Sequence, residues 1–360
     1  MFSINPKYYY DIFIHFCLFL VLFTLFHSYI LSLWDKKNIA FIRVSGYTLL
    51  IFVLLFMGLR PYSKYFGDMV NYTVLFNKYA AGAPANTDKD VFFNYFTKFC
   101  SSVMTIKAYF ALCTIIYIWP MYRISKELFK EYWYYSFLLF LVSFSFWTYG
   151  VNGMRNGMAT SLFLLGVSYR RKKPLMIIIF IIASYTHQTV VLPILAYTIS
   201  VFYNKPKVFI YGWFAAIPLS LILGGFWEST FASLGFGGDR LSYLTTEAKA
   251  GTFSRTGFRW DFLIYGAGAI FAGWYFIFKR KFNDKIYHQL FITYTICNAF
   301  WILVIRANFS NRFAYLSWFM MGLIIIYPFL KQQFFKNQHI VLGKVILLYF
   351  SFTYFMYLIS

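Results

Sequence analysis

The chain has 360 residues, of which only 12% are charged while 60% are hydrophobic and 25% are aromatic. A soluble domain covers its surface with charged side chains, so this composition excludes a soluble protein and indicates that lipid surrounds most of the chain. The formal net charge is +21, but the Lys and Arg residues are spread over short loops and form no basic arm or face. We therefore expect no nucleic-acid partner and interpret the charge as a signal of membrane topology.

The apolar segments are long enough to cross about 30 Å of hydrocarbon as helices. The first one is too long for the apolar core of a signal peptide and lacks a small-residue cleavage site, so we expect it to remain as a helix. In chain order, the predicted transmembrane helices lie at residues 8–33, 41–59, 103–121, 133–149, 155–169, 208–224, 260–278, 287–305, 312–330 and 340–358. The sequence predicts an all-α, polytopic integral membrane protein with a single transmembrane domain over residues 1–360.

The segment 174–203 allows two interpretations, because polar residues from Thr186 to Thr189 interrupt it at its centre. It is either one tilted helix or two short helices that meet at a polar turn, a re-entrant-like hairpin. The densest basic cluster, residues 170–173, predicts a cytoplasmic loop. Only the hairpin also keeps the basic cluster at 279–285 inside. We therefore expect about 12 spans, with both termini outside.

This topology leaves two long external connections, 60–102 and 225–259, whereas every internal loop is short. Function is expected on the outer face. Seven arginines are expected on this face, most of them at or near helix ends: Arg60, Arg155, Arg240, Arg255, Arg259, Arg306 and Arg312. The planar guanidinium group matches phosphate bidentately. The residues expected to bind a pyrophosphate at headgroup depth are Arg60, Arg155, Arg306 and Arg312. The alternative is that each arginine reaches lipid phosphates or pairs with a nearby acid.

Arg155 lies in the glycine-containing turn 152–157, and no acid lies within four residues of it. An arginine in a tight apolar turn needs a negative partner, supplied either by a ligand or by an acid from elsewhere in the chain. Asp68 follows Arg60 at short range on the same face. It is either a general base or the ion-pair partner of Arg60 or Arg155.

His187 is placed at the break in segment 174–203, where an ionisable residue is a candidate for proton transfer. A histidine that bonds only to a backbone carbonyl is the alternative. Three aromatic side chains are candidates for stacking on sugar rings: Tyr72, Trp227 and Tyr315. The aromatic residues of the 225–259 loop also fit an amphipathic segment that lies on the membrane.

Asp88 and Asp90 form an Asp-x-Asp pair in the first external connection. Such a pair can hold a divalent metal, but here it stands in a polar stretch without supporting ligands, so we expect no metal site and no cofactor. Four cysteines lie in or beside apolar segments without the paired spacing of a zinc site or a disulfide framework: Cys17, Cys100, Cys113 and Cys297.

Several short motifs occur in a characteristic order: Gly58-Leu59-Arg60 with Gly67-Asp68 and Tyr72, Gly153-Met154-Arg155-Asn156, Ala183-Ser184 with Thr186-His187-Gln188, and Asn311-Arg312-Phe313 with Tyr315. In this order and spacing the chain resembles the EpsG branch of the Wzy-type polysaccharide polymerases from about residue 44 to 330. It departs from the family pattern at Gln188-Thr189, where a small hydroxyl residue often follows the histidine.

The resemblance implies a glycosyltransferase that joins oligosaccharide repeat units carried on undecaprenyl pyrophosphate at the outer face of a bacterial inner membrane. Its partners would be the lipid-linked oligosaccharide, the bilayer and a protein that sets chain length. Arg155 would stabilise the leaving pyrophosphate, and Asp68 or His187 would deprotonate the acceptor hydroxyl. Two other classes remain as alternatives, a membrane O-acyltransferase and a flippase for lipid-linked oligosaccharides.

Overall fold

The computed structural model describes residues 4–233, 257–307 and 310–359. Within these ranges every regular element is helical, which confirms the predicted all-α fold class. The chain divides into two compact units, Met1–Val190 with Phe329–Ser360, and Val191–Pro328. The single transmembrane domain over residues 1–360 stays a prediction.

The first unit contains ten α-helices and four short 3-10 turns among the described residues. The α-helices are α1 (Tyr9–Ile30), α2 (Lys36–Gly58), α3 (Met69–Ala80), α4 (Val91–Val103), α5 (Ile106–Phe129), α6 (Trp133–Leu141), α7 (Phe146–Val151), α8 (Met154–Ser168), α9 (Lys173–Thr186) and α17 (Gln338–Leu358). The turns are η1 (Pro6–Tyr8), η2 (Lys64–Phe66), η3 (Lys130–Tyr132) and η4 (Gln188–Val190). Asp35 caps α2 by accepting from the backbone N–H of Lys37 at 2.7 Å.

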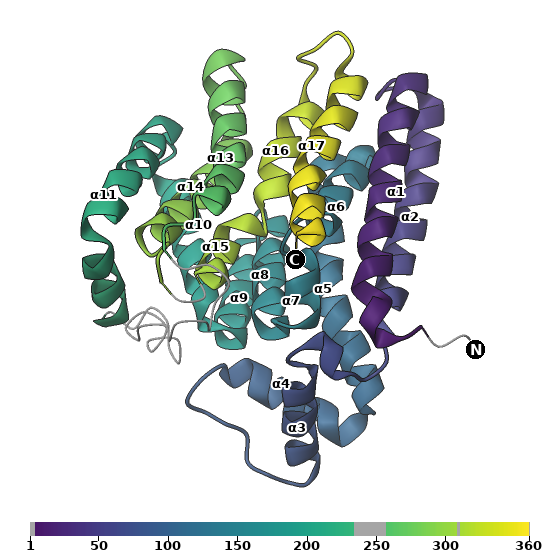
Figure 1. Ribbon diagram of the computed structural model, residues 1–360, viewed down its shortest axis with the longest axis vertical. Helices are drawn as coiled ribbons and strands as arrows, with labels where there is room; N and C mark the ends of the chain where they lie inside the picture. Colours follow the sequence, from purple (N-terminus) through teal and green to yellow (C-terminus); the bar gives the residue numbers. More distant parts are fainter. Residues whose placement is uncertain (1–3, 234–256, 308–309, 360) are drawn as a thin grey trace. The chain divides into compact units, whose positions relative to one another are not determined.

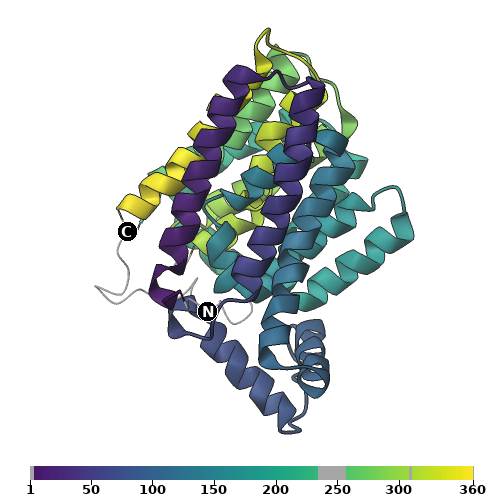
Figure 2. The same cartoon turned by 90° about the vertical axis from the view of Figure 1, so that its right-hand side faces the viewer.

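Helix α5 connects the two ends of this unit and packs against α2 and α8. Its 24 residues rise about 36 Å. At one end, two arginines pair with acids at or just after the end of α5: Arg43 of α2 with Glu131 at 3.2 Å, and Arg170 with Glu127 at 3.6 Å. At the other end lie α3 and α4 (Figure 1). Figure 2 shows α1 and α2 side by side above these two short helices.

The second unit is built around α14 (Lys285–Leu303), which packs against α10 (Val191–Phe202), α11 (Pro206–Ser233), α13 (Trp260–Trp274) and α15 (Asn311–Trp318). The π-helical segment η6 (Tyr275–Lys279) continues α13, and most of α16 (Met321–Lys331) follows α15. Buried Asn298 joins three of these helices, because it accepts a hydrogen bond from Trp213 Nε1 at 2.7 Å and donates one to Ser317 Oγ at 3.0 Å.

Six helical segments of the described chain are long and apolar enough to cross a membrane: Pro6–Ile30, Lys36–Gly58, Pro206–Trp227, Trp260–Lys279, Asn311–Lys331 and Gln338–Leu358. Many side chains on these segments that are turned away from the core are large and apolar, as Ile51 (57% exposed) and Leu348 (73%) show. The protein is therefore membrane-embedded. The count of about 12 spans stays a prediction.

Several predicted boundaries need correction. The connection 60–102 contains two helices, α3 and α4, instead of an extended loop. The predicted span 133–149 is two helices, α6 and α7. At this break the Ser143 hydroxyl bonds to the Phe140 carbonyl at 2.9 Å, a local bond that competes with regular helix geometry.

The segment 174–203 is two short helices, α9 and α10, separated at His187 as the second interpretation proposed. Of the predicted connection 225–259, residues up to Ser233 are helical and belong to α11. Most of the remainder, including Arg240 and Arg255, lies outside the described residues.

Candidate functional site

Asp90 stands immediately before α4 with a left-handed backbone conformation (φ +48°). Aspartate tolerates this conformation better than most residues. Although an acid at this position commonly caps a helix, the Asp90 side chain makes no capping hydrogen bond to α4. Its carboxylate instead contacts residues of α8 and of the break after α9, which are 65 and 97 positions away in sequence.

Three charged or titratable side chains meet at this point, and we call Asp90, Arg155 and His187 the Asp90 cluster. Arg155 Nη1 donates to Asp90 Oδ2 at 2.7 Å. His187 Nδ1 lies 3.1 Å and 3.3 Å from the two carboxylate oxygens. The side chains of Asp90 and His187 are only 7% and 12% exposed, whereas that of Arg155 is 43% exposed. The cluster therefore has a shielded carboxylate and a guanidinium group that solvent or a ligand can reach.

The environment keeps Asp90 ionised. Burial on its own raises the pKa of this carboxyl, but the hydrogen bond and charge of His187 and the charge of Arg155 outweigh burial, so that the pKa falls below its ordinary value. The backbone N–H of Gln188 contributes to the same effect. At neutral pH the cluster therefore holds one fixed negative charge between two nitrogen groups.

Arg155 is positioned by the close approach of α7 and α8. A Cβ at Gly157 would lie 2.2 Å from the Tyr149 carbonyl oxygen, so only glycine allows this contact. The backbone N–H of Arg155 donates to the phenol oxygen of Tyr72 at 3.4 Å, and its guanidinium carbon lies 5.8 Å from the centre of the Phe93 ring. The helices α3 and α4 thus contact Arg155 through both its backbone and its side chain.

His187 is held where α9 ends. Its backbone is extended, and its N–H donates to the Ala183 carbonyl at 3.1 Å. The contact of Nδ1 with a carboxylate favours the tautomer in which Nδ1 carries the proton and Nε2 carries the basic lone pair. The alternative considered from the sequence, a ring bonded only to a backbone carbonyl, is replaced by a carboxylate–imidazole pair.

Asp68 lies close by but has a different partner. Its backbone N–H donates to Asn152 Oδ1 at 2.8 Å, and its carboxylate accepts from Asn71 Nδ2 at 3.1 Å. The ion-pair partner of Arg155 is Asp90 and not Asp68. A role for Asp68 as a general base stays a prediction.

Arg60 is buried, with 4% of its surface exposed. Its Nη1 donates to the Met57 carbonyl and, at 3.4 Å, to Thr114 Oγ1. Its guanidinium carbon lies 5.7 Å and 5.8 Å from the ring centres of Phe66 and Phe110. The predicted contact of Arg60 with a pyrophosphate is not available in this structure, because helices α2, α5 and α8 enclose the side chain. Arg60 instead joins these helices, because it bonds to Met57 of α2, Thr114 of α5 and Met154 of α8.

The predicted sugar-stacking residues differ in exposure. Tyr72 (6% exposed) and Tyr315 (1%) are buried, so neither ring has a face on which a sugar can stack in this structure. Trp227 is partly exposed, and its Nε1 donates to the Leu219 carbonyl at 3.3 Å.

Arg306 and Arg312 belong to the second unit. Arg306 is exposed and donates to the Leu221 carbonyl at 3.4 Å, beside the irregular backbone of α11 at Leu223. Arg312 is partly exposed near the start of α15. Pyrophosphate binding by these two residues stays a prediction.

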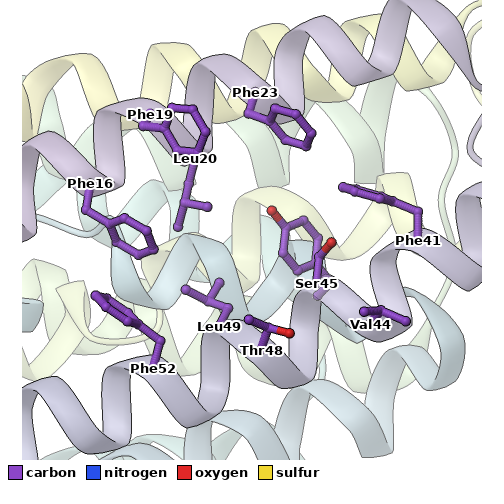
Figure 3. Close-up of a pocket in the computed structure, with 11 residues that line it drawn as sticks. Phe16, Phe19, Leu20, Phe23, Phe41, Val44, Ser45, Thr48, Leu49 and Phe52 are labelled. Atoms are coloured by element: carbon purple, nitrogen blue, oxygen red, sulfur yellow. The ribbon is translucent and has the colours of Figure 1, made fainter.

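An apolar cavity of about 390 Å³ lies between α1 and α2 (Figure 3). Aromatic pairs bound it, with ring centres 4.4 Å apart for Phe16–Phe52 and 5.7 Å apart for Phe23–Phe41. Its few polar groups are hydroxyls, including that of Tyr134. A lining of this kind does not match an anionic or sugar ligand, so we place the candidate site at the Asp90 cluster.

Sequence reasoning found Arg155 and His187 but missed the role of Asp90. The Asp-x-Asp pattern drew attention to Asp90 only as a possible metal ligand. No group of three or more His, Cys, Asp or Glu side chains that could hold a metal occurs among the described residues. No local signal connects Asp90 to Arg155 or His187, because they lie 65 and 97 positions away from it in sequence.

Fold and site together define a membrane-embedded, all-helical protein with a carboxylate–imidazole–guanidinium cluster at one end of its first unit. Comparison with protein-family models gives the family: residues 46–360 match the EpsG family, and the chain belongs to it. No curated protein and no solved structure matches the chain significantly.

Proposed function

We propose that this protein is a polysaccharide polymerase that joins oligosaccharide repeat units carried on undecaprenyl pyrophosphate. The observation that carries the proposal is the Asp90 cluster, in which one shielded carboxylate holds both an imidazole and an accessible guanidinium group. Membership of the EpsG family supports a role in polysaccharide biosynthesis. The chemistry requires a base and a cation close together, and the cluster contains both.

In the proposed reaction, an acceptor sugar hydroxyl loses its proton to Nε2 of His187 and its oxygen attacks the anomeric carbon of the donor chain. A new C–O glycosidic bond forms as the bond from that carbon to the pyrophosphate oxygen breaks. The electron pair leaves with undecaprenyl pyrophosphate. Asp90 orients His187 and stabilises its protonated form, as carboxylates do for catalytic histidines on other folds.

Arg155 would stabilise the leaving group. One of its nitrogen atoms is bonded to Asp90, but 43% of its side chain is exposed. Remaining N–H groups of the guanidinium can therefore donate to pyrophosphate oxygens as negative charge develops there. The proposed reaction uses no metal ion, because Arg155 is proposed to neutralise the negative charge that develops on the leaving pyrophosphate.

We also propose that the cluster faces the outside of a bacterial cytoplasmic membrane. Within the first unit, the cluster lies at the end of α5 opposite the basic loop that contains Arg170 and opposite Arg43 of α2. Basic loops are typically cytoplasmic, which leaves the cluster on the external side. Lipid-linked repeat units would then reach it from the outer leaflet, where a chain-length-regulating protein would also act.

The test is to incubate the purified protein in liposomes with lipid-linked repeat units and to separate the products by size. We expect a ladder of polymers, which neither an O-acyltransferase nor a flippase would produce. His187→Gln and Asp68→Asn then identify the base. If only Asp68→Asn abolishes the ladder, His187 is not the base, and a wild-type protein that gives no ladder contradicts the function.

A further inference from the structure

Helix α4 has an unusual distribution of polarity. Its outward stripe is apolar and runs along positions i, i+3, i+7 and i+11: Phe92 (36% exposed), Tyr95 (53%), Phe99 (65%) and Val103 (58%). A helix on the surface of a water-soluble protein turns its polar residues outward. An outward stripe of this composition indicates that the surroundings of α4 are not bulk water.

The inward face of α4 contains polar groups that are bonded within the protein. Asn94 (7% exposed) accepts from the Tyr79 hydroxyl at 2.9 Å and donates to the Lys89 carbonyl at 2.8 Å. Thr97, fully buried, lies 3.0 Å from the Tyr109 hydroxyl. These bonds fix the rotation of α4, so the aromatic stripe cannot turn inward without losing them.

The neighbouring helix α3 is more polar on its outward face. This face includes Asn71, Asn77 and Lys78, all exposed, together with Val74 (63% exposed). The two helices pack against each other, yet α3 presents mainly polar side chains, whereas the large side chains that α4 exposes are aromatic or aliphatic. This contrast indicates that the boundary between water and lipid passes along the pair.

The segment that follows α2 shows the same kind of surface. Leu59 (67% exposed), Tyr62 (57%) and Tyr65 (60%) come directly after a helix that is long and apolar enough to span the membrane. Tyrosines at the end of a span are typical of the belt at the membrane–water interface. Exposed aromatic residues on α4 therefore lie at the same end of the first unit as this belt.

We propose that α4 is an interfacial helix whose aromatic stripe inserts into the outer headgroup region of the bilayer. The occupant of this surface is lipid, because the adjoining segment leaves a membrane span and the stripe is rich in residues that favour the interface. Asp90 directly precedes α4, so this placement holds the Asp90 cluster at headgroup depth. The membrane contact of α4 does not depend on the proposed reaction. The advantage of holding the cluster at the depth of a lipid-linked pyrophosphate rests on the proposed function.

Site-directed spin labelling tests the placement directly. The four cysteines of the chain are buried, so labels can be introduced separately by Phe99→Cys and Tyr95→Cys on α4 and by Asn77→Cys on α3 as the matched control. With the protein in phosphatidylcholine–phosphatidylglycerol nanodiscs, the accessibility of each label to oxygen and to a water-soluble nickel complex is measured. We expect the oxygen-to-nickel ratio at positions 95 and 99 to exceed that at position 77 several-fold.

Ratios at positions 95 and 99 that are low, like that of a label in water, would show that α4 faces water and would overturn the proposal. Labels at 95 and 99 that are protected from both reagents would also overturn it, because another protein surface would then cover the stripe. A polymerisation assay on the same preparations reports separately on the proposed function, so failure of one proposal does not imply failure of the other.

Discussion

Arg155 is bonded to the Asp90 carboxylate in the structure and, in the proposed function, also donates to the leaving pyrophosphate. The bond to Asp90 offsets the cost of placing a guanidinium group in the first turn of α8, among apolar helices. Its remaining exposure leaves a donor surface for an anion. A residue of this kind affects both local structure and function, so a test must separate the two.

For Arg155 we expect that Arg155→Ala lowers the polymerisation rate by roughly 100-fold, the usual effect of removing one donor to a developing negative charge. Arg155→Lys keeps the charge but loses the planar fork, so we expect it to fold normally and to lose most of the activity. The rate is measured with purified protein, and the level of each variant in membranes is measured alongside.

The control for Arg155→Ala is Arg43→Ala, which removes another arginine from an ion pair, with Glu131 at the opposite end of the unit. We expect this control to keep normal activity. Near-normal polymer from Arg155→Ala would refute the assigned role. Loss of protein from the membrane in both Arg155→Ala and Asp90→Ala would show that the pair is structural.

Asp90 is expected to make the stability of the folded protein depend on pH. Because its pKa is lowered in the folded state, the cluster contributes stability above the carboxyl pKa of the unfolded chain, and this contribution is lost as the pH falls through the lowered folded value. We expect Asp90→Asn to be less stable than the wild type at pH 7, with the difference shrinking in strong acid. The measurement is the melting temperature in detergent as a function of pH.

Asp88→Asn is the matched control for the pH experiment, since Asp88 is an exposed neighbour on the same connection. It should melt like the wild type at every pH. A stability difference for Asp90→Asn that is constant across the pH range would mean that the charge of the Asp90 carboxylate does not stabilise the fold.

At the scale of elements, the α3–α4 pair packs on α5 and α9 and is also attached to its unit by a tight turn and a few polar bonds. Gly67 has φ +56°, and a Cβ built there would lie 2.4 Å from Asn152 Oδ1, the atom that accepts the Asp68 N–H. Backbone conformation and close packing therefore both require glycine at this position.

We expect Gly67→Ala to destabilise the protein by about 1–2 kcal/mol from backbone strain and, in addition, to displace Asn152 and loosen the attachment of α3. Gly82→Ala separates the two effects, because Gly82 also has a positive φ (+91°) but no atom within 4 Å of a built Cβ. Thermal unfolding in detergent measures the first effect, and amide hydrogen exchange in α3 measures the second. Equal exchange rates in the two variants would contradict the docking role of this turn.

At the scale of the whole molecule, the prediction concerns orientation. The loop with Arg170, Arg171 and Lys172 should be cytoplasmic, and α3 should be external, because short basic loops stay inside. We expect Lys78→Cys to react with a membrane-impermeant thiol reagent in intact cells and Lys172→Cys to react only after the membrane is permeabilised. Both positions are exposed in the structure, so the reverse pattern would mean that the topology is inverted.

The sequence alone determined the solvent of this protein and most of its helices, because long apolar runs with few charges have only one stable arrangement in lipid. The helices at the two ends of the chain, α1, α2 and α17, match the predicted segments within a few residues at most boundaries. Breaks inside apolar segments were harder to foresee, since a span that bends at Ser143 has the same composition as a straight one.

Only the tertiary structure decided which acid serves the site. Arg155 and His187 stood out in the sequence because a charge in an apolar turn and a histidine at a helix break both have a local cost. Asp90 had no such cost, because an acid in a polar stretch before a helix is ordinary. Its importance arises when packing brings it within 3.1 Å of His187 and 2.7 Å of Arg155. Contacts between residues so far apart in sequence are set by the fold and leave no local pattern.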